Sequence, residues 1–226
     1  MKNPFKTLSK FETGLWLISV AVVFISSLFS GIEGIFSGIA SLVGVTALIF
    51  VAKGMITGQV LTIVFALMYG TISLFFGYYG EAITYGGMTL PMAAASLVSW
   101  IRHPFKDTDE VKIDHLSFKK ILLVSLSAVA VTIAFYFILE ALGTAKLVVS
   151  TISITTSWSA CTLTFLRSPY YALAYATNDI VLIILWVSAA VTDISCLPMT
   201  FCFIMFLLND LYGFYNWKRM QKAQEE

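Results

Sequence analysis

Charged residues are scarce in this sequence, and their scarcity excludes most classes of soluble protein. Only 12% of the 226 residues are charged, whereas 58% are hydrophobic. Soluble domains carry about 25% charged residues. A transmembrane helix needs about 20 mostly apolar residues, so the length allows seven or eight helices with very short connections. The sequence therefore predicts an integral membrane protein with no room for a soluble catalytic domain.

Sequence motifs of catalysis and cofactor binding are also missing. The three cysteines, Cys161, Cys196 and Cys202, lie in apolar runs at spacings that match no zinc or redox site. We expect them to pack as small hydrophobic side chains. Both histidines, His103 and His115, lie in one polar loop. Because no HExxH, GxSxG, P-loop or carboxylate cluster occurs, we expect no enzyme activity, no metal, no cofactor and no nucleic-acid partner.

Eight apolar stretches are predicted as membrane spans. With a cytoplasmic N-terminus, every one of the 14 Lys and Arg residues except Lys146 lies on the cytoplasmic side, as the positive-inside rule requires. Both termini are then cytoplasmic. The first stretch also has the features of a signal peptide, since lysines precede it and small residues follow near Ser30. Its removal would leave seven spans in the same orientation. The stretches are Leu15–Phe29, Ile32–Phe50, Val60–Tyr78, Gly86–Trp100, Ile121–Leu142, Leu147–Leu166, Tyr171–Ala190 and Leu197–Tyr215.

The polar segment from Arg102 to Lys120 separates two halves that resemble each other. A shift of one half along the other places Trp100 on Trp217 and Arg102 on Arg219. Chance similarity among apolar helices is the alternative to a true repeat. A single helix between two triplets keeps both in the same orientation, as in transporters with parallel repeats and a binding site between them. The predicted parts are an N-terminal helix (1–31), a first triplet (32–101), a loop and linking helix (102–142), and a second triplet with a tail (143–226).

The run YATNDIVLIILW, residues 175–186, places a polar pair in an apolar helix. Asn178 and Asp179 precede six aliphatic residues and Trp186. A central Asp costs about 2.5–3.5 kcal/mol on insertion scales. Helical spacing places Tyr175, Asn178 and Trp186 on one face with Asp179 at its margin. At this depth the face is predicted to turn toward protein or a water-filled cavity.

Other spans carry polar and aromatic residues that could complete this cavity. The preceding helix repeats Thr and Trp on one face, the last helix adds Asn209 and Asp210, and an earlier helix offers Gln59 and Tyr69. Such a cavity suits a flat cationic ring attached to a polyhydroxyl group. Alternatively these residues hold helices together, Gln59 caps a helix, and Asp210 pairs with Lys218 or Arg219. The predicted substrate-binding residues are Trp158, Asn178, Asp179, Trp186, Asn209, Tyr175, Gln59, Tyr69, Thr155 and Thr162.

Three segments resemble the PnuC nicotinamide riboside transporters. They are GYYGEAI (77–83), LTFLRSPYYALAYATNDIVLIILW (163–186) and LYGFYNWKR (211–219). The resemblance implies an all-α polytopic bundle of three, one and three helices, related to SWEET-type sugar facilitators, with an extra N-terminal helix. It implies facilitative uptake of nicotinamide riboside for NAD synthesis, trapping by cytosolic phosphorylation, and a homotrimer in the bilayer of the bacterial cytoplasmic (inner) membrane. Relatives for thiamin and riboflavin leave the vitamin open.

Under this resemblance, Trp158 and Trp186 would stack on the pyridinium ring. Asn178 and Asn209 would bind the carboxamide or hydroxyls, and Asp179 would hold ribose or offset the positive charge. No Lys or Arg lies at mid-depth, which favours a riboside over a nucleotide. Three alternatives remain open: a polar-solute channel, a lipid-modifying membrane enzyme, and a carrier coupled to protons through Asp179 or Asp210.

Overall fold

The computed structural model is all-helical over the residues that it describes, 4–29, 31–75, 79–106, 108–144, 146–192 and 197–226. Within these ranges the bridges Met55–Glu110 and Pro104–Val111 are isolated and form no strand. The predicted all-α class is confirmed. The elements are η1 (Pro4–Thr7), α1 (Lys10–Ser27), α2 (Gly31–Ala52), α3 (Ile56–Phe75), α4 (Tyr79–Ile83), η2 (Thr84–Thr89), α5 (Leu90–Arg102), α6 (Phe118–Ala141), α7 (Leu147–Phe165), α8 (Tyr171–Ala190) and α9 (Leu197–Glu225).

Five of the described helices, α1, α3, α6, α7 and α8, are long and apolar enough to cross a membrane. The chain therefore fits a multi-pass membrane protein. The other predicted spans correspond to α2, to the run α4–η2–α5 and to α9. Two predicted boundaries differ most from the ends of the helices. The fourth segment begins at Tyr79 instead of Gly86, and the last continues past Tyr215 to Glu225, because an apolar window stops at glycines and charges that a helix tolerates.

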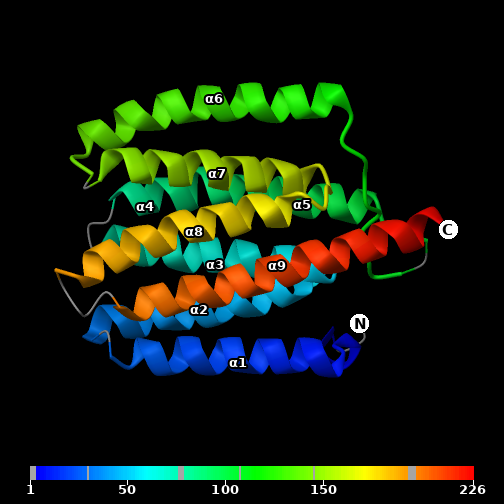
Figure 1. The fold of residues 1–226 in the computed structure, drawn as a ribbon, viewed down its shortest axis with the longest axis horizontal. Coiled ribbons are helices and arrows are strands. Elements are labelled where there is room, and N and C mark those ends of the chain that lie inside the picture. The colour runs from blue at the N-terminus through cyan, green and yellow to red at the C-terminus, as the bar shows by residue number, and fades with distance from the viewer. Residues whose placement is uncertain (1–3, 30, 76–78, 107, 145, 193–196) are drawn as a thin grey trace.

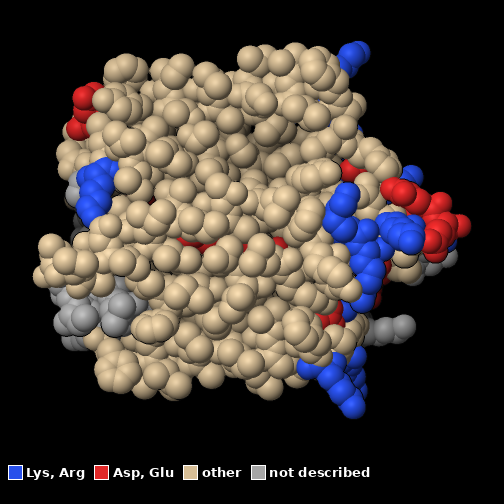
Figure 2. Space-filling view, viewed as in Figure 1, with Lys and Arg blue, Asp and Glu red and all other residues tan. Residues whose placement is uncertain are grey.

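The long helices lie side by side in one bundle (Figure 1). α1 forms one edge and packs against α2 and α9, while α6 forms the opposite edge and packs against α7. Both termini and the segment 103–117 lie at the same end of the bundle. Most blue side chains also gather there (Figure 2), on an otherwise largely uncharged surface.

Helices α2 and α7 end in the same kind of turn at this end of the bundle. Gly54 and Arg167 adopt left-handed backbone angles, with φ of 66° and 55°. The Gly54 N–H donates to Val51 O at 2.8 Å, and the Arg167 N–H donates to Thr164 O at 3.0 Å. The N–H of the next residue donates to the carbonyl one position further back. Met55 N–H donates to Phe50 O and Ser168 N–H donates to Leu163 O, both at 3.0 Å. This paired pattern satisfies the last carbonyls of both helices.

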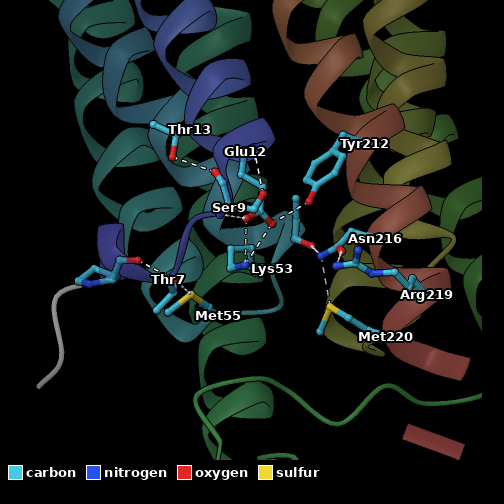
Figure 3. A network of polar contacts seen from close by, with 12 residues as sticks. Thr7, Ser9, Glu12, Thr13, Lys53, Met55, Tyr212, Asn216, Arg219 and Met220 are labelled. Atoms are coloured by element: carbon cyan, nitrogen blue, oxygen red, sulfur yellow. Dashed lines mark hydrogen bonds and ion pairs between the residues drawn. The ribbon is translucent and has the colours of Figure 1, made fainter. Parts of the chain in front are cut away.

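A buried ion pair fixes α1 to the bundle (Figure 3). Ser9 caps α1, and its N–H donates to Glu12 Oε2 at 2.6 Å in a capping box. Glu12 is 1% exposed, and it accepts from Lys53 Nζ at 3.1 Å and from the Tyr212 hydroxyl at 2.7 Å. A buried carboxylate is stable only when it is paired in this way, so the polar contacts define where α1 packs.

Candidate binding cavity

A cavity of about 570 Å³ lies among α2, α3, α4–η2–α5, α7, α8 and α9. Its lining reaches from Leu142 and Lys146, at the α6–α7 connection, to Thr164 and Tyr171 near the end that carries the termini. Figure 2 shows acidic atoms at the bottom of a seam in the otherwise uncharged middle of the molecule. The cavity therefore crosses much of the bundle and contains acidic groups.

Aromatic packing closes the cavity at the end that carries the termini. Tyr171 belongs to a buried cluster with Trp100 and Trp217, and the same cluster includes Val111 and Ile113 from the connecting loop. The Tyr171 and Trp217 rings meet edge to face with centroids 4.8 Å apart. Trp100 and Trp217 are 0% exposed, so this aromatic packing lies fully inside the bundle.

Helix α8 presents the predicted polar face to the cavity. Tyr175, Asn178, Asp179 and Trp186 all line it. Asn178 Oδ1 accepts hydrogen bonds from the hydroxyls of two α7 residues, at 2.8 and 2.9 Å. None of the described hydrogen bonds uses its Nδ2 group, so this amide can donate into the cavity.

Asp179 of α8 and Asp210 of α9 meet within the cavity wall. They are 3% and 4% exposed, and their carboxyl groups lie in hydrogen-bonding contact. Two ionised carboxylates only accept, so a hydrogen bond between these groups requires a proton on one of them. Asp179 Oδ2 has no hydrogen-bond partner among the described residues. Because a buried polar atom is costly when unpaired, this oxygen marks a place for a ligand donor.

The first half of the chain adds a second polar and aromatic wall. Gln59, which is 2% exposed, lines the cavity with Tyr69, Glu81 and Tyr85. The centroids of the Tyr69 and Tyr85 rings lie 4.5 Å apart. Glu81 hydrogen-bonds the Tyr69 hydroxyl. The two halves thus face each other with a carboxyl group on each side.

Comparison with known proteins agrees with this architecture. A model of the nicotinamide mononucleotide transporter family matches residues 34–219. The chain belongs to this family, the PnuC transporters.

The chain is similar to one curated protein and to one solved structure. The nicotinamide riboside transporter PnuC of Neisseria mucosa is 26% identical over 191 residues, which are 82% of this chain and 73% of the relative. The solved structure described as the crystal structure of the vitamin B3 transporter PnuC has a TM-score of 0.80 at 24% identity, over 96% of this chain and 94% of that one. The structural likeness shows a shared PnuC fold, and membership in a transporter family agrees with the expectation that the chain is no enzyme.

Four of the residues predicted for the PnuC substrate site do not line the cavity. Trp158 and Thr155 turn toward α6, where Trp158 Nε1 donates to Ser127 Oγ at 3.0 Å and the Thr155 hydroxyl contacts that of Thr132 at 2.6 Å. These two residues hold the linking helix against α7. The structure places them outside the lining of this cavity, because α6 offers hydroxyl partners that a hydropathy pattern cannot reveal.

Asn209 and Thr162 are also buried elsewhere. Asn209 Nδ2 donates to Ser19 Oγ of α1 at 2.9 Å and to Met205 O at 2.8 Å. Thr162 is 7% exposed, and its hydroxyl has no hydrogen-bond partner among the described residues. Asn209 therefore holds α9 against α1, which is the helix-packing role that polar residues often have in membranes.

The cavity also contains residues absent from the predicted site. Asp210 lines it beside Asp179 instead of pairing with Lys218 or Arg219. Glu81 and Tyr85 line the opposite wall. Glu81 could have been noticed as an acidic residue within an apolar stretch. It was overlooked because the predicted span began at Gly86, which left Glu81 in a connecting loop.

Two of the three cysteines are buried in the bundle, as expected for small packed side chains. Cys161 and Cys202 are free and buried, and Cys196 lies outside the described residues. Cys161 Sγ contacts the Tyr175 hydroxyl at 3.2 Å. Among the described residues, no three His, Cys, Asp or Glu side chains gather as a metal site.

Proposed function

We propose that this chain carries nicotinamide riboside across the membrane by binding it in the described cavity. The observation that carries the proposal is the buried, unpartnered Oδ2 of Asp179 in the cavity wall. A ribose hydroxyl is a donor of suitable chemistry for this oxygen. The name of the Neisseria mucosa relative supports the same substrate.

The neighbouring groups suit the rest of such a ligand. The Asn178 amide and the Gln59 side chain offer donors and acceptors for a carboxamide and for hydroxyls. Tyr175 and Trp186 contribute aromatic surface to the same wall. A mostly apolar cavity with a few directed polar groups is the usual form of a small-molecule site.

The charges of the cavity favour a riboside over the mononucleotide in the family's description. Among the described residues that line the cavity, Lys146 has the only basic side chain, and it lies at the α6–α7 rim. Glu81, Asp179 and Asp210 lie inside. Phosphate recognition generally needs Arg or Lys contacts, whereas acidic groups attract a pyridinium ring.

The proposal includes two parallel helix triplets, α2 to α5 and α7 to α9, with α6 as the link and α1 as the added helix. The shared turn at the ends of α2 and α7 supports this arrangement. With the positive-inside rule, the end that carries the termini is cytoplasmic, in a bacterial inner membrane. The proposed assembly is a homotrimer, and trapping of the riboside by cytosolic phosphorylation completes uptake.

Transport is proposed to be facilitative, and a proton-coupled carrier is the second candidate. The contact between Asp179 and Asp210 favours the second candidate, because a shared proton could leave with each substrate. Uptake of riboside into proteoliposomes distinguishes the two mechanisms. A facilitator equilibrates the riboside and then stops, with or without a pH gradient. Accumulation above equilibrium that depends on the pH gradient would establish coupling instead.

Substrate identity is tested by ligand-induced stabilisation of the purified protein. A ligand that binds only the folded state raises the melting temperature by mass action. We expect nicotinamide riboside to raise it more than nicotinamide mononucleotide, thiamin or riboflavin at equal concentration. A larger effect of thiamin, riboflavin or the nucleotide would replace the riboside as the proposed substrate while leaving the family unchanged.

A further inference from the structure

The fourth transmembrane segment contains an irregular turn beside the cavity. Residues Thr84–Thr89 form the π-helix η2, and the Leu90 N–H donates to Tyr85 O, five positions back. Pro91 follows at the start of α5, and it has no N–H for the regular bond to Gly87 O. π-turns within helices often occur at functional sites. In this segment, the turn places Tyr85 in the cavity wall.

Tyr85 completes a cluster of three aromatic rings with two residues of α3. The Tyr69 and Tyr85 centroids lie 4.5 Å apart, and the Phe65 centroid lies 5.7 Å from Tyr69 and 5.6 Å from Tyr85. All three residues line the cavity. A cation within about 6 Å of a ring centroid is attracted to the face of the ring. The cluster therefore offers several ring surfaces to one cation.

Glu81 places an acidic side chain beside these rings. It lies one turn before Tyr85, and it lines the cavity. The hydroxyls of Tyr69 and Ser73 donate to its carboxylate. Tyr85 lies close to both Glu81 and Asp179, so the ring cluster is near acidic groups from both halves of the chain.

We propose that Phe65, Tyr69, Tyr85 and Glu81 form the subsite that selects a ligand with a cationic ring over its neutral counterpart. This inference rests on the proposed function, and it assigns the pyridinium end of the riboside to the first half of the chain. The sugar end then meets Asp179 in the second half. Substrate binding thereby connects the two halves across the cavity.

Trp186 is the alternative position for the ring, as the sequence suggested. Trp186 lies seven positions after Asp179 on α8, a rise of about 10 Å along the helix. None of the described ring contacts involves Trp186, and helix α8 carries no acidic residue within one turn of it. The aromatic cluster beside Glu81 combines both features that a cation requires, so it is the better subsite.

The test compares two ligands that differ in ring charge. Nicotinamide riboside carries a pyridinium cation, whereas its reduced dihydropyridine form is neutral. Calorimetric titration of the full-length purified protein gives a Kd for each, and their ratio measures the preference for the cation. The variants are Glu81→Gln, which preserves shape, and Tyr85→Leu. Glu140→Gln is the matched control, because Glu140 is exposed and does not line the cavity.

We expect wild type and Glu140→Gln to prefer the cation. Glu81→Gln and Tyr85→Leu should each reduce this preference by about 3- to 30-fold, mainly through weaker binding of the cationic form. If Tyr85→Leu does not fold, Glu81→Gln decides alone. An unchanged preference in folded Glu81→Gln would overturn the subsite while the proposed function stands. A wild-type protein that binds no riboside would overturn the proposed function and the subsite together.

Discussion

The indole rings of Trp100 and Trp217 pack against each other with centroids 5.4 Å apart. Each ring also binds the end of a helix from the other half. Trp100 Nε1 donates to Thr164 O at 3.1 Å, and Trp217 Nε1 donates to Val51 O at 2.9 Å. Both acceptors also receive the N–H that closes the turn after their helix. The two halves therefore exchange equivalent contacts at this end.

The residues that precede the two tryptophans repeat this exchange. Ser99 Oγ donates to Phe165 O at 2.9 Å, and Asn216 Nδ2 donates to Ala52 O at 2.8 Å. In each case the acceptor is the last residue of α7 or α2. The same geometry from unrelated side chains, Ser and Asn, supports the proposed repeat more strongly than the short sequence matches do.

We predict that the tryptophan pair stabilises the bundle cooperatively. Trp100→Phe and Trp217→Phe each remove a hydrogen bond and part of a buried ring, so each should cost about 1–3 kcal/mol. Because the rings touch, the double variant should deviate from additivity. Thermal unfolding in detergent measures the losses. Trp16→Phe, at a partly buried indole bonded to Thr46, should cost less; an equal loss there would contradict a special role for the pair.

A glycine of α3 is predicted to be essential for packing against the end of α2. A Cβ added at Gly58 would lie 2.5 Å from Val51 N and 2.9 Å from Phe50 C. These are backbone atoms, so Gly58→Ala should destabilise by about 1–3 kcal/mol and displace the neighbouring Gln59. At Gly14 no atom lies within 4 Å of an added Cβ, so Gly14→Ala should be neutral or stabilising by up to about 1 kcal/mol. Similar melting temperatures for both variants would refute the close contact.

Asp114 in the connecting loop should make stability depend on pH. Burial opposes its ionisation, but the Lys120 hydrogen bond and the Lys120 and Arg167 charges outweigh this effect and hold the pKa of Asp114 below its ordinary value. The ionised Asp114 therefore contributes its full stabilisation at pH values above the ordinary pKa of Asp, about 4. It is lost as the pH falls through the lower folded pKa.

The Asp114 prediction is tested with two amide variants. Asp114→Asn should lower the melting temperature at pH 7, and its difference from wild type should shrink in acid. Asp109→Asn is the control, since none of the described ion pairs involves Asp109. A difference that stays constant with pH would show that the ionised carboxylate is unimportant.

The membrane orientation is predicted from the distribution of basic residues. In a background without native cysteines, Asp109→Cys in the loop should resist an impermeant thiol reagent added to intact cells. Thr192→Cys is the matched control, because Thr192 is exposed after α8 at the opposite end of the bundle, and it should react. The reverse pattern would invert the proposed orientation.

Hydropathy and helical spacing predicted the helices and one wall of the cavity, because both follow from local sequence. The shared face of Tyr175, Asn178 and Trp186 is an example, and all three residues line the cavity. The partner of a polar residue depends on which helix lies opposite, and spacing within one helix does not determine it. Trp158 and Asn209 were therefore assigned to the wrong neighbours. Glu81 was missed because the π-turn extends a helix that the glycines seemed to end.

The last prediction separates residues that bind the ligand from residues that hold helices together. Asp179→Asn preserves shape but replaces the unpartnered carboxyl oxygen with a weaker acceptor or an amide NH2 group, so riboside affinity should fall by about 2- to 10-fold, the equivalent of one hydrogen bond. Trp158→Phe removes the bond to Ser127 of α6 and part of the ring, at a residue outside the cavity lining, so it should lower the melting temperature and leave affinity unchanged. Calorimetry on folded protein measures both. Normal affinity in Asp179→Asn, or a large loss in folded Trp158→Phe, would reverse the assignment of these two residues.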